Sequence, residues 1–252
     1  LGEATKFSQY LLDADKAYES TFVLGLATTT GDAEGETLAT SDASSVEETQ
    51  VREGLEDFRG EIEQVPSMYS AIKQDGTPLY KLARQGKEVE RQPRRVTVKR
   101  LEMTAFRPGE RAELDIVLEC SKGTYVRSIA EDLGRALGCG AHVSALRRTR
   151  VGPFRIEDSV SLVALEALKE HGDLDRMDAL LLSADSALGE LPMVRVSESS
   201  GFYIRQGQPV QVPNAPLNGM VRVALESGEF LGVGEILDDG RVAPRRLIVT
   251  GR

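Results

Sequence analysis

The feature that most constrains the fold is a strand pattern followed at once by a helix pattern. Leu114, Ile116, Leu118 and Cys120 alternate with other residues, which predicts a strand with one buried face. After a turn at 121–123, apolar residues at positions 126, 129, 133 and 137 have helical spacing, and the glycine at 138 is typical of a helix end. This stretch is therefore expected to be a strand, a turn and an amphipathic helix.

Similar patterns predict elements on both sides of this unit. The serines at 44 and 45 each stand three residues before a glutamate, a doubled capping-box pattern that predicts the start of a helix ending near Gly60. The apolar phase shifts within a strand predicted over 96–106, which indicates a bulge near Lys99. The other elements expected are a helix end at 6–12, strands at 18–26 and 143–151, helices at 78–85, 162–170 and 174–182, and short strands at 193–196, 221–225, 229–236 and 246–249.

Composition excludes several classes of function. No run of about 18 apolar residues occurs, so we expect no membrane span. The first ten residues lack the basic and apolar regions of a signal peptide, which favours a cytoplasmic protein. Cys120 and Cys139 have no C-x-x-C spacing and are expected to be small buried hydrophobes, with a disulfide or metal site as the alternative. With two histidines in the chain, a multi-histidine metal centre is not expected.

Charge is distributed unevenly along the chain. Residues 1–65 hold 4 Lys or Arg against 15 Asp or Glu, a net charge of −11, whereas residues 66–107 hold 10 against 4, a net charge of +6. The basic segment fits an arm that binds nucleic-acid phosphates, because lysine and arginine release counterions from such a backbone. It fits a solvated charged surface equally well, and charge alone does not decide between them.

Two short motifs carry groups suited to RNA chemistry. Pro66-Ser-Met-Tyr-Ser-Ala-Ile-Lys73 offers hydroxyls, an aromatic ring and an amine, although an ordinary loop would explain it as well. Ser121-Lys-Gly-Thr-Tyr-Val-Arg127 places Arg127 on the first turn of the predicted helix, where the helix dipole disfavours a cation. A carboxylate partner would compensate, either in a structural ion pair or in an active site.

Both motifs resemble signatures of the TruB and dyskerin-type pseudouridine synthases. The string Asp15-Lys-x-Tyr18, the element from Gly138 to Arg148 that contains Leu146, and the later Ile204-Arg-Gln-Gly-Gln-Pro-Val, typical of a PUA domain, resemble family motifs in the same order. The resemblance implies an α+β pseudouridine synthase fold with a central antiparallel sheet and flanking helices. It implies a catalytic domain over 1–190 with an RNA-binding arm near 66–95, and a small β-barrel PUA domain over 191–252.

The resemblance also implies the chemistry. The expected reaction isomerises the T-arm uridine of tRNA, uridine 55, to pseudouridine, with no metal or organic cofactor, in a monomer whose partner is tRNA. Arg127 would pair with the family's catalytic aspartate, Tyr18 would stack on the flipped base and Leu146 would support the pocket. The residues expected to bind RNA are Ser70, Lys73, Lys81, Arg84, Arg94, Arg95 and Arg148.

Two of these side chains have plain structural alternatives. Tyr18 shares the apolar face of its predicted strand, and could be an ordinary core tyrosine. Arg127 could belong to a structural ion pair.

One family motif is absent from the 252 residues. The sequence G-A-L-D-P-x-A-[ST]-G, which carries the nucleophilic aspartate, does not occur, and no Asp of this chain has that context. We therefore expect this chain alone to be inactive. The alternative function is a non-catalytic tRNA-binding protein or tRNA-folding chaperone, which would use the basic arm and the PUA domain without the chemistry.

Overall fold

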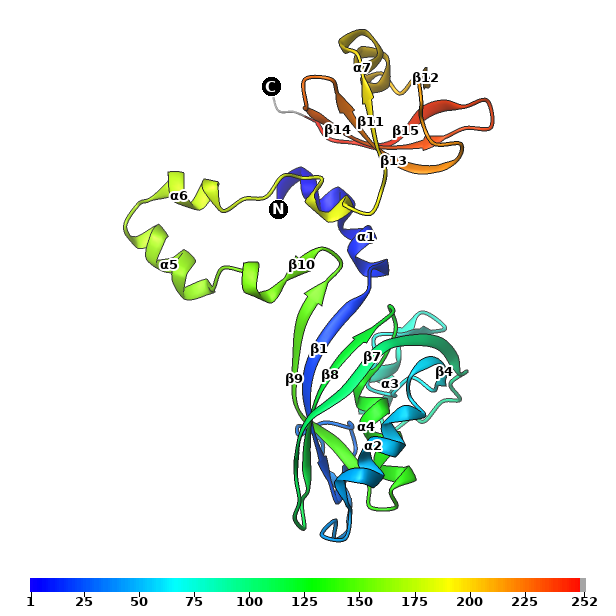
Figure 1. Cartoon of the computed structure of the whole chain (residues 1–252), viewed down its shortest axis with the longest axis vertical. Helices are drawn as coiled ribbons and strands as arrows, with labels where there is room; N and C mark the ends of the chain where they lie inside the picture. The colour runs from blue at the N-terminus through cyan, green and yellow to red at the C-terminus, as the bar shows by residue number, and fades with distance from the viewer. Residues whose placement is uncertain (250–252) are drawn as a thin grey trace. The chain divides into compact units, whose positions relative to one another are not determined.

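The computed structural model describes residues 1–249 and contains two compact units. One unit consists of residues 14–151, and the other combines residues 1–13 with the chain from residue 152 onward. Each is described by itself (Figure 1). The division into domains 1–190 and 191–252 stays a prediction.

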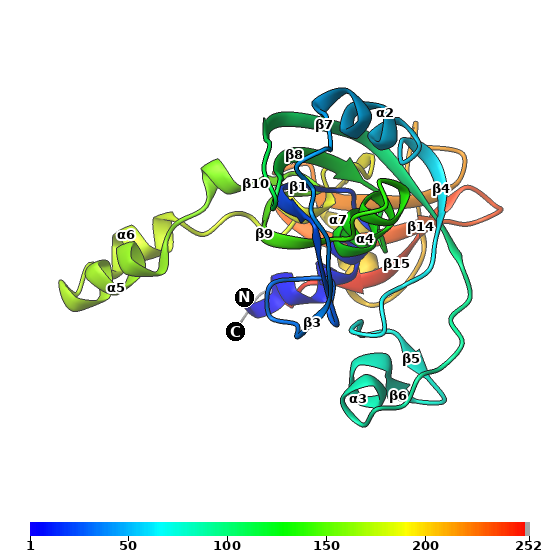
Figure 2. The same cartoon turned by 90° about the horizontal axis from the view of Figure 1, so that it is seen from below.

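The unit of residues 14–151 is built on an antiparallel sheet with the strand order β9-β1-β8-β7-β4. Helices α2 and α4 lie on one face of this sheet, as Figure 1 shows. A small hairpin of β2 and β3 and an arm of β5, β6 and α3 are added to it, and the arm stands off the sheet on two chain segments (Figure 2). The elements are β1 (Lys16–Leu24), β2 (Leu26–Thr28), β3 (Thr37–Thr40), α2 (Glu48–Glu56), β4 (Gly60–Gln64), β5 (Lys73–Gln74), β6 (Thr77–Pro78), α3 (Leu79–Arg84), β7 (Arg94–Arg107), β8 (Glu113–Cys120), α4 (Val126–Ala136) and β9 (Ala141–Val151).

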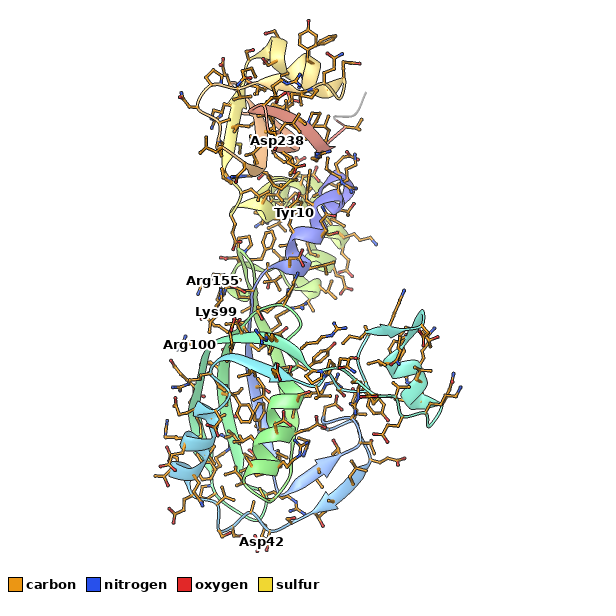
Figure 3. The ribbon with its side chains drawn as sticks, turned by 90° about the vertical axis from the view of Figure 1, so that its right-hand side faces the viewer. Tyr10, Asp42, Lys99, Arg100, Arg155 and Asp238 are labelled. Carbon is orange, nitrogen blue, oxygen red and sulfur yellow. The ribbon has the colours of Figure 1, made fainter. Side chains whose placement is uncertain are left out.

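The strand–turn–helix expectation is confirmed in detail. Strand β8 buries every second side chain, and α4 buries Val126, Ile129 and Leu133, whereas Leu137 is the C-cap and is partly buried. Gly138 follows the C-cap with a φ of 75°, a conformation that favours glycine over other residues. The register of β7 against β8 shifts between Val98 and Arg100, so the bulge lies at Lys99 as predicted; Lys99 and Arg100 are labelled in Figure 3.

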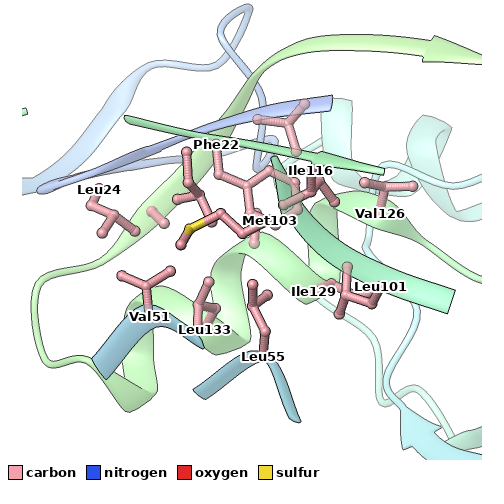
Figure 4. Close-up of a cluster of buried hydrophobic side chains, with 14 of the residues drawn as sticks. Phe22, Leu24, Val51, Leu55, Leu101, Met103, Ile116, Val126, Ile129 and Leu133 are labelled. Carbon is pink, nitrogen blue, oxygen red and sulfur yellow. The ribbon is translucent and has the colours of Figure 1, made fainter. Parts of the chain in front are cut away.

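The core of this unit lies between the sheet and its two helices (Figure 4). Phe22 and Leu24 of β1, Leu133 of α4 and Val51 of α2 are fully buried there. Burying one such side chain stabilises the fold by about 1.5–3 kcal/mol. The sheet and the two helices are therefore held together mainly by apolar contact.

The second unit contains a curled sheet with the order β11-β13-β14-β15-β12 (Figure 1). The first residues of the chain pack on it: the Phe7 ring meets Phe230 edge to face at 5.5 Å, and Lys6 Nζ donates to the Leu247 carbonyl at 3.1 Å. The elements are η1 (Gly2–Phe7), α1 (Ser8–Asp13), β10 (Phe154–Arg155), η2 (Ile156–Asp158), α5 (Leu162–Glu170), α6 (Leu174–Ala179), η3 (Ser186–Leu188), β11 (Met193–Val196), α7 (Glu198–Arg205), β12 (Val210–Gln211), β13 (Gly219–Leu225), β14 (Phe230–Ile236) and β15 (Arg241–Leu247).

Several predicted boundaries are wrong. Helix α2 begins after Glu47, whose side chain forms the capping box with Gln50, because Ser44 is bonded instead to the Asp42 carboxylate in a turn. The helix ends at Glu56, four residues before Gly60, which instead opens the unpredicted strand β4. The last strand spans Arg241–Leu247 and not 246–249, and helix α7 is not evident from the sequence because its eight residues carry a weak apolar pattern.

The close packing of α4 on β9 makes a testable prediction about Gly134. A Cβ there would collide with the Ala141 amide nitrogen, so Gly134→Ala must displace backbone. We expect the variant to lower the free energy of unfolding by about 1–3 kcal/mol, although alanine is the better helix former by about 1 kcal/mol. Urea unfolding followed by circular dichroism measures this change.

The matched control is Gly54→Ala in α2, where the added Cβ meets only the Leu133 Cδ1 methyl at 3.0 Å. That side chain can give way, so we expect a change within about 1 kcal/mol. Equal effects of the two substitutions would contradict the packing argument.

Candidate active site and RNA-binding arm

The turn that precedes α4 is fixed by its neighbours in the sheet. The buried Gln64 side chain at the end of β4 accepts from the Tyr125 amide at 2.7 Å and donates to the Tyr125 carbonyl at 3.0 Å. The Ser121 amide donates to the Thr97 carbonyl of β7, and the Ser121 hydroxyl accepts from the Thr97 amide. Arg127 therefore leaves the first turn of α4 from a backbone held on two sides.

The Arg127 guanidinium joins two loops that are distant in sequence. Its Nη1 donates to the Asp32 carboxylate at 2.8 Å and to the Thr30 carbonyl at 3.2 Å, and its Nη2 donates to the Tyr69 carbonyl at 3.0 Å. The side chains of Arg127 and Asp32 are 23% and 27% exposed, so the pair is partly desolvated but reachable from solvent. The structure therefore contains the structural ion pair expected as one alternative for Arg127, with Asp32 as its carboxylate, whereas the pairing with the family's catalytic aspartate stays a prediction.

Sequence reasoning missed Asp32, which lies in the loop between β2 and β3. Its Oδ1 accepts from the Thr30 hydroxyl at 2.5 Å and from the Glu34 amide at 3.2 Å. Burial by itself raises the pKa of Asp32, but the hydrogen bonds from Thr30, Arg127 and the Glu34 amide outweigh it and hold the pKa below its usual value. The spacing Thr30-x-Asp32, in which a hydroxyl can bind a carboxylate two residues on, was the available signal.

Glu131 lies one helical turn after Arg127, beneath the same loop. A Cβ added to Gly31 would lie 2.8 Å from Glu131 Oε1, so the loop backbone rests directly on this carboxylate. Burial raises the pKa of Glu131, and the charge of Asp132 adds to the effect. The loop that holds Asp32 therefore has a glycine at a point where a side chain would collide with α4.

Tyr18, Leu146 and Arg148 lie together on two neighbouring strands. Tyr18 in β1 is paired with Arg148 in β9, and Ser20 is paired with Leu146. Tyr18 is partly buried against the main core, whereas Leu146 is 48% exposed. Burial raises the pKa of Tyr18, and the cation of Arg148 opposes that shift. The base-stacking role of Tyr18 and the supporting role of Leu146 stay predictions.

The predicted RNA-binding residues of the arm fall into two groups. Lys73, Lys81, Arg84, Arg94 and Arg95 are the cationic group, of which Arg94 and Arg95 begin β7 and are exposed. Arg84 lies over the Tyr80 ring at 5.6 Å, and Arg95 has a long ion pair of 3.9 Å with Glu63, in which both side chains are mostly exposed. Ser70 is instead 3% exposed, and its backbone carbonyl accepts from the Tyr80 amide. Contact of Ser70 with RNA would need the arm to open, and its role stays a prediction.

The described part of the chain has no group of three or more His, Cys, Asp or Glu side chains placed to hold a metal ion. Cys120 and Cys139 are both buried and unbridged. None of the helices within residues 1–249 is long and apolar enough to cross a membrane.

Comparison with known families covers nearly the whole chain. Residues 1–126 match TruB family pseudouridylate synthase (N terminal domain), residues 127–189 match the tRNA pseudouridylate synthase B C-terminal domain, and residues 192–248 match Pseudouridine synthase II TruB, C-terminal. The tRNA pseudouridine synthase B of Ectopseudomonas mendocina (strain ymp) is 56% identical over 250 residues, which is 99% of this chain and 80% of that protein. That of Stutzerimonas stutzeri (strain A1501) is 55% identical over 247 residues, 98% of this chain and 80% of that protein.

Solved structures share the fold. A chain from the structure of an H/ACA RNP bound to a substrate RNA containing 2'-deoxyuridine aligns with a TM-score of 0.72 at 22% identity, covering 99% of this chain and 71% of that one. A chain of a Cbf5-Nop10-Gar1 complex aligns with a TM-score of 0.69 at 24% identity, covering 100% and 70%. The α+β fold with a central antiparallel sheet and a curled C-terminal sheet is therefore confirmed.

The Arg127–Asp32 pair predicts how Asp32 titrates. In Arg127→Gln, the carboxylate loses its cation while its burial remains, so we expect the pKa of Asp32 to rise. Because its pKa is lowered in the folded state, ionised Asp32 stabilises the fold at neutral pH, and this contribution is lost as the pH falls through the acidic range. The variant should therefore lose less of its free energy of unfolding on acidification than the parent chain. Carbon-13 NMR titration of the carboxyl measures the shift.

Arg135→Gln is the control for this titration. Arg135 lies two turns further along α4, is 75% exposed and pairs with Asp132 rather than Asp32. The pKa of Asp32 should not change in that variant. An unchanged pKa in Arg127→Gln as well would mean that Arg127 is not the partner that ionises Asp32.

Proposed function

Because this chain belongs to the TruB family of pseudouridine synthases, we propose that it serves the isomerisation of a T-arm uridine of tRNA, uridine 55, to pseudouridine. The observation that carries the proposal is the arrangement around Arg127, a partly desolvated arginine on the first turn of α4 that is held by two loops. The relatives named tRNA pseudouridine synthase B, at 52–56% identity, support tRNA as the substrate.

The guanidinium of Arg127 keeps one edge available. Arginine has five N–H donors, and Nη1 uses both of its own on Thr30 and Asp32 while Nη2 uses one on Tyr69. The Nε–H and one Nη2–H have no acceptor within the described residues, and the Nε–Nη2 edge of a guanidinium is one that binds a carboxylate in bidentate geometry. We propose that the family's catalytic aspartate occupies this edge.

The reaction exchanges one glycosidic bond for another. The N1–C1′ bond breaks, a C5–C1′ bond forms, the C5 proton leaves to water and N1 gains a proton. The aspartate that starts this sequence lies in the G-A-L-D-P motif, which is absent from the 252 residues. Asp32 is not proposed to replace it, because Asp32 is already bound to Arg127 Nη1 and to Thr30.

Tyr18 and Leu146 supply the proposed apolar surface for the flipped uracil. Unstacking a base from the T-loop costs a few kcal/mol, and stacking on an aromatic ring recovers about 1–3 kcal/mol of it. Arg148, paired with Tyr18 across β1 and β9, would bind a phosphate beside that base. The cations of the arm would bind the flanking phosphates, in a monomeric cytoplasmic protein.

A second function is supported by one observation. The chain has a basic arm and a C-terminal region that matches the family, and both suit RNA binding without chemistry. A tRNA-binding or tRNA-folding protein without catalysis would need no more than these parts. The two functions differ in whether pseudouridine forms when the motif is supplied.

We predict that the 252-residue chain alone makes no pseudouridine. The measurement is tritium release from tRNA labelled at C5 of uridine, which should equal the release without protein. A fusion that places the motif-bearing segment of a relative before Leu1 should release tritium. In that fusion Arg127→Ala should lose most of the rate with little change in tRNA affinity.

These outcomes separate the two functions. Release by the 252-residue chain would contradict the assigned nucleophile. Release by neither protein, combined with tight tRNA binding by both, would favour the non-catalytic function. A fall in affinity at constant rate in Arg127→Ala would make Arg127 a phosphate ligand instead.

We also predict that the arm binds tRNA mainly through phosphates. Removing one cation that neutralises a phosphate should lower the slope of log affinity against log salt by roughly 0.7–0.9. Changing Lys81, Arg84 and Arg94 together to Gln should therefore weaken tRNA binding and flatten that slope. Fluorescence anisotropy over a range of salt concentrations measures both quantities.

The control removes three exposed arginines that lie outside the arm. Arg52, Arg135 and Arg241 each form a local ion pair. Changing these three to Gln removes three positive charges, as the arm variant does. The control slope should stay close to that of the parent chain. Equal slopes in the arm variant and the parent would make the basic segment a solvated surface.

A further inference from the structure

We infer that the arm contains a pocket for a single unstacked nucleotide of the bound RNA. The arm pocket is a cavity of about 320 Å³ between the β5–β6 hairpin and the returning segment 90–94. Its lining includes Pro66, Ile72, Lys73, Leu79, Arg91 and Arg94. The inference rests on the proposed function for its source of RNA, and it assigns to the arm a role beyond neutralising phosphates.

The walls of the arm pocket are held by hydrogen bonds to the backbone. The hairpin turns at Asp75 and Gly76, which both have positive φ, 48° and 80°, as a two-residue turn of this kind requires. The Leu79 amide donates to the Ile72 carbonyl at 2.7 Å and closes the base of the hairpin. Arg91 Nη1 donates to the Pro66 carbonyl at 3.0 Å and ties the returning segment to the start of the arm. The pocket is therefore preformed.

The lining combines an apolar floor with a cationic rim. Pro66, Ile72 and Leu79 form the apolar part of the lining; Pro66 and Leu79 are buried, so a flat base would contact mainly the partly exposed Ile72. Lys73 and Arg94 on the rim are exposed. With Arg91 they give three cations against the one carboxylate of Glu90. An apolar floor beside a positive rim is the chemistry that binds a base and its phosphate together.

Two further groups suit a nucleotide. The amides of Gln74 and Gln92 line the same cavity and offer both donors and acceptors to the edge of a base. The Nε–H of Arg91 is buried with no acceptor in the described structure, so this guanidinium is not saturated by the protein. The volume lies at the low end of small-ligand pockets, about 300–1,000 Å³, which admits one nucleotide and excludes a duplex.

The adjoining cavity shows why the assignment is selective. That cavity, about 460 Å³ between the base of the arm and α4, is also lined by Arg91. Its lining holds four carboxylates, those of Glu63, Glu88, Glu131 and Asp132, against Arg91 and Arg135. A phosphate is repelled there and attracted on the other side of Arg91. Lys81 and Arg84 of α3 continue the positive charge along the arm, which favours an RNA strand over a free mononucleotide.

The test is binding to the full 252-residue chain, followed by methyl NMR of Ile72 and Leu79. Uridine monophosphate and a single-stranded uridine pentanucleotide are the two ligands. We expect both to shift these methyl signals, with the pentanucleotide binding more tightly. Arg94→Gln should weaken binding of uridine monophosphate roughly tenfold, since it removes one charge-assisted hydrogen bond.

Arg52→Gln is the matched control. Arg52 of α2 is exposed and carries the same charge, but it lies outside the arm, does not line the arm pocket and pairs with Glu48. The affinity of this variant for uridine monophosphate should equal that of the parent chain. Equal weakening in both variants would show general charge attraction and overturn the pocket, as would methyl signals that do not respond to either ligand.

The remaining outcomes separate this inference from the proposed function. Binding of uridine monophosphate without binding of the pentanucleotide would make the ligand a free nucleotide and contradict the inference. If the methyl signals do not respond, while the chain still binds tRNA and the fusion releases tritium, the nucleotide pocket alone would be overturned. If the methyl signals respond but the fusion makes no pseudouridine, the nucleotide pocket would stand and the proposed function would be overturned.

Discussion

The interaction on which the candidate site depends is the set of hydrogen bonds made by Arg127. One guanidinium holds the Thr30–Asp32 loop and the base of the arm at Tyr69, two segments that share no strand of the main sheet. Leaving Arg127 without these acceptors would cost more than the bonds contribute, because a partly buried cation would keep its desolvation penalty. The loop, the arm base and α4 therefore form one arrangement with a common anchor.

The rigid parts of the unit of residues 14–151 serve that anchor. Gln64 and Ser121 bind the turn before α4 to β4 and β7, and Gly31 lets the loop rest on Glu131. Each of these contacts fixes a position from which Arg127 or Asp32 projects. The arm differs, since its exposed cations suit a partner outside the chain. Its positive charge contrasts with the acidic first 65 residues.

Prediction from sequence succeeded where local pattern and tertiary packing agree. Strand β8, helix α4 and the bulge at Lys99 follow from apolar periodicity, because the buried face of each element is the face that its pattern defines. The prediction failed where a different local hydrogen bond engaged the residue expected to cap the helix. Ser44 had the right spacing for a cap, but the Asp42 carboxylate bound it, and Glu47 capped α2 instead. Strand β4 escaped detection because three of its five residues are polar, two glutamates and a glutamine, and only pairing with β7 orders them.

The sequence by itself determined the family resemblance, the order of the main elements and the need for a carboxylate beside Arg127, since these depend on residue identity and on short-range spacing. Only the tertiary structure decided that Asp32 forms an ion pair with Arg127, that Ser70 is buried and that Arg91 lines both a cationic pocket and an acidic one. The physical reason is the distance along the chain. Arg127 and Asp32 are 95 residues apart, and their contact exists only after the sheet has closed the intervening chain.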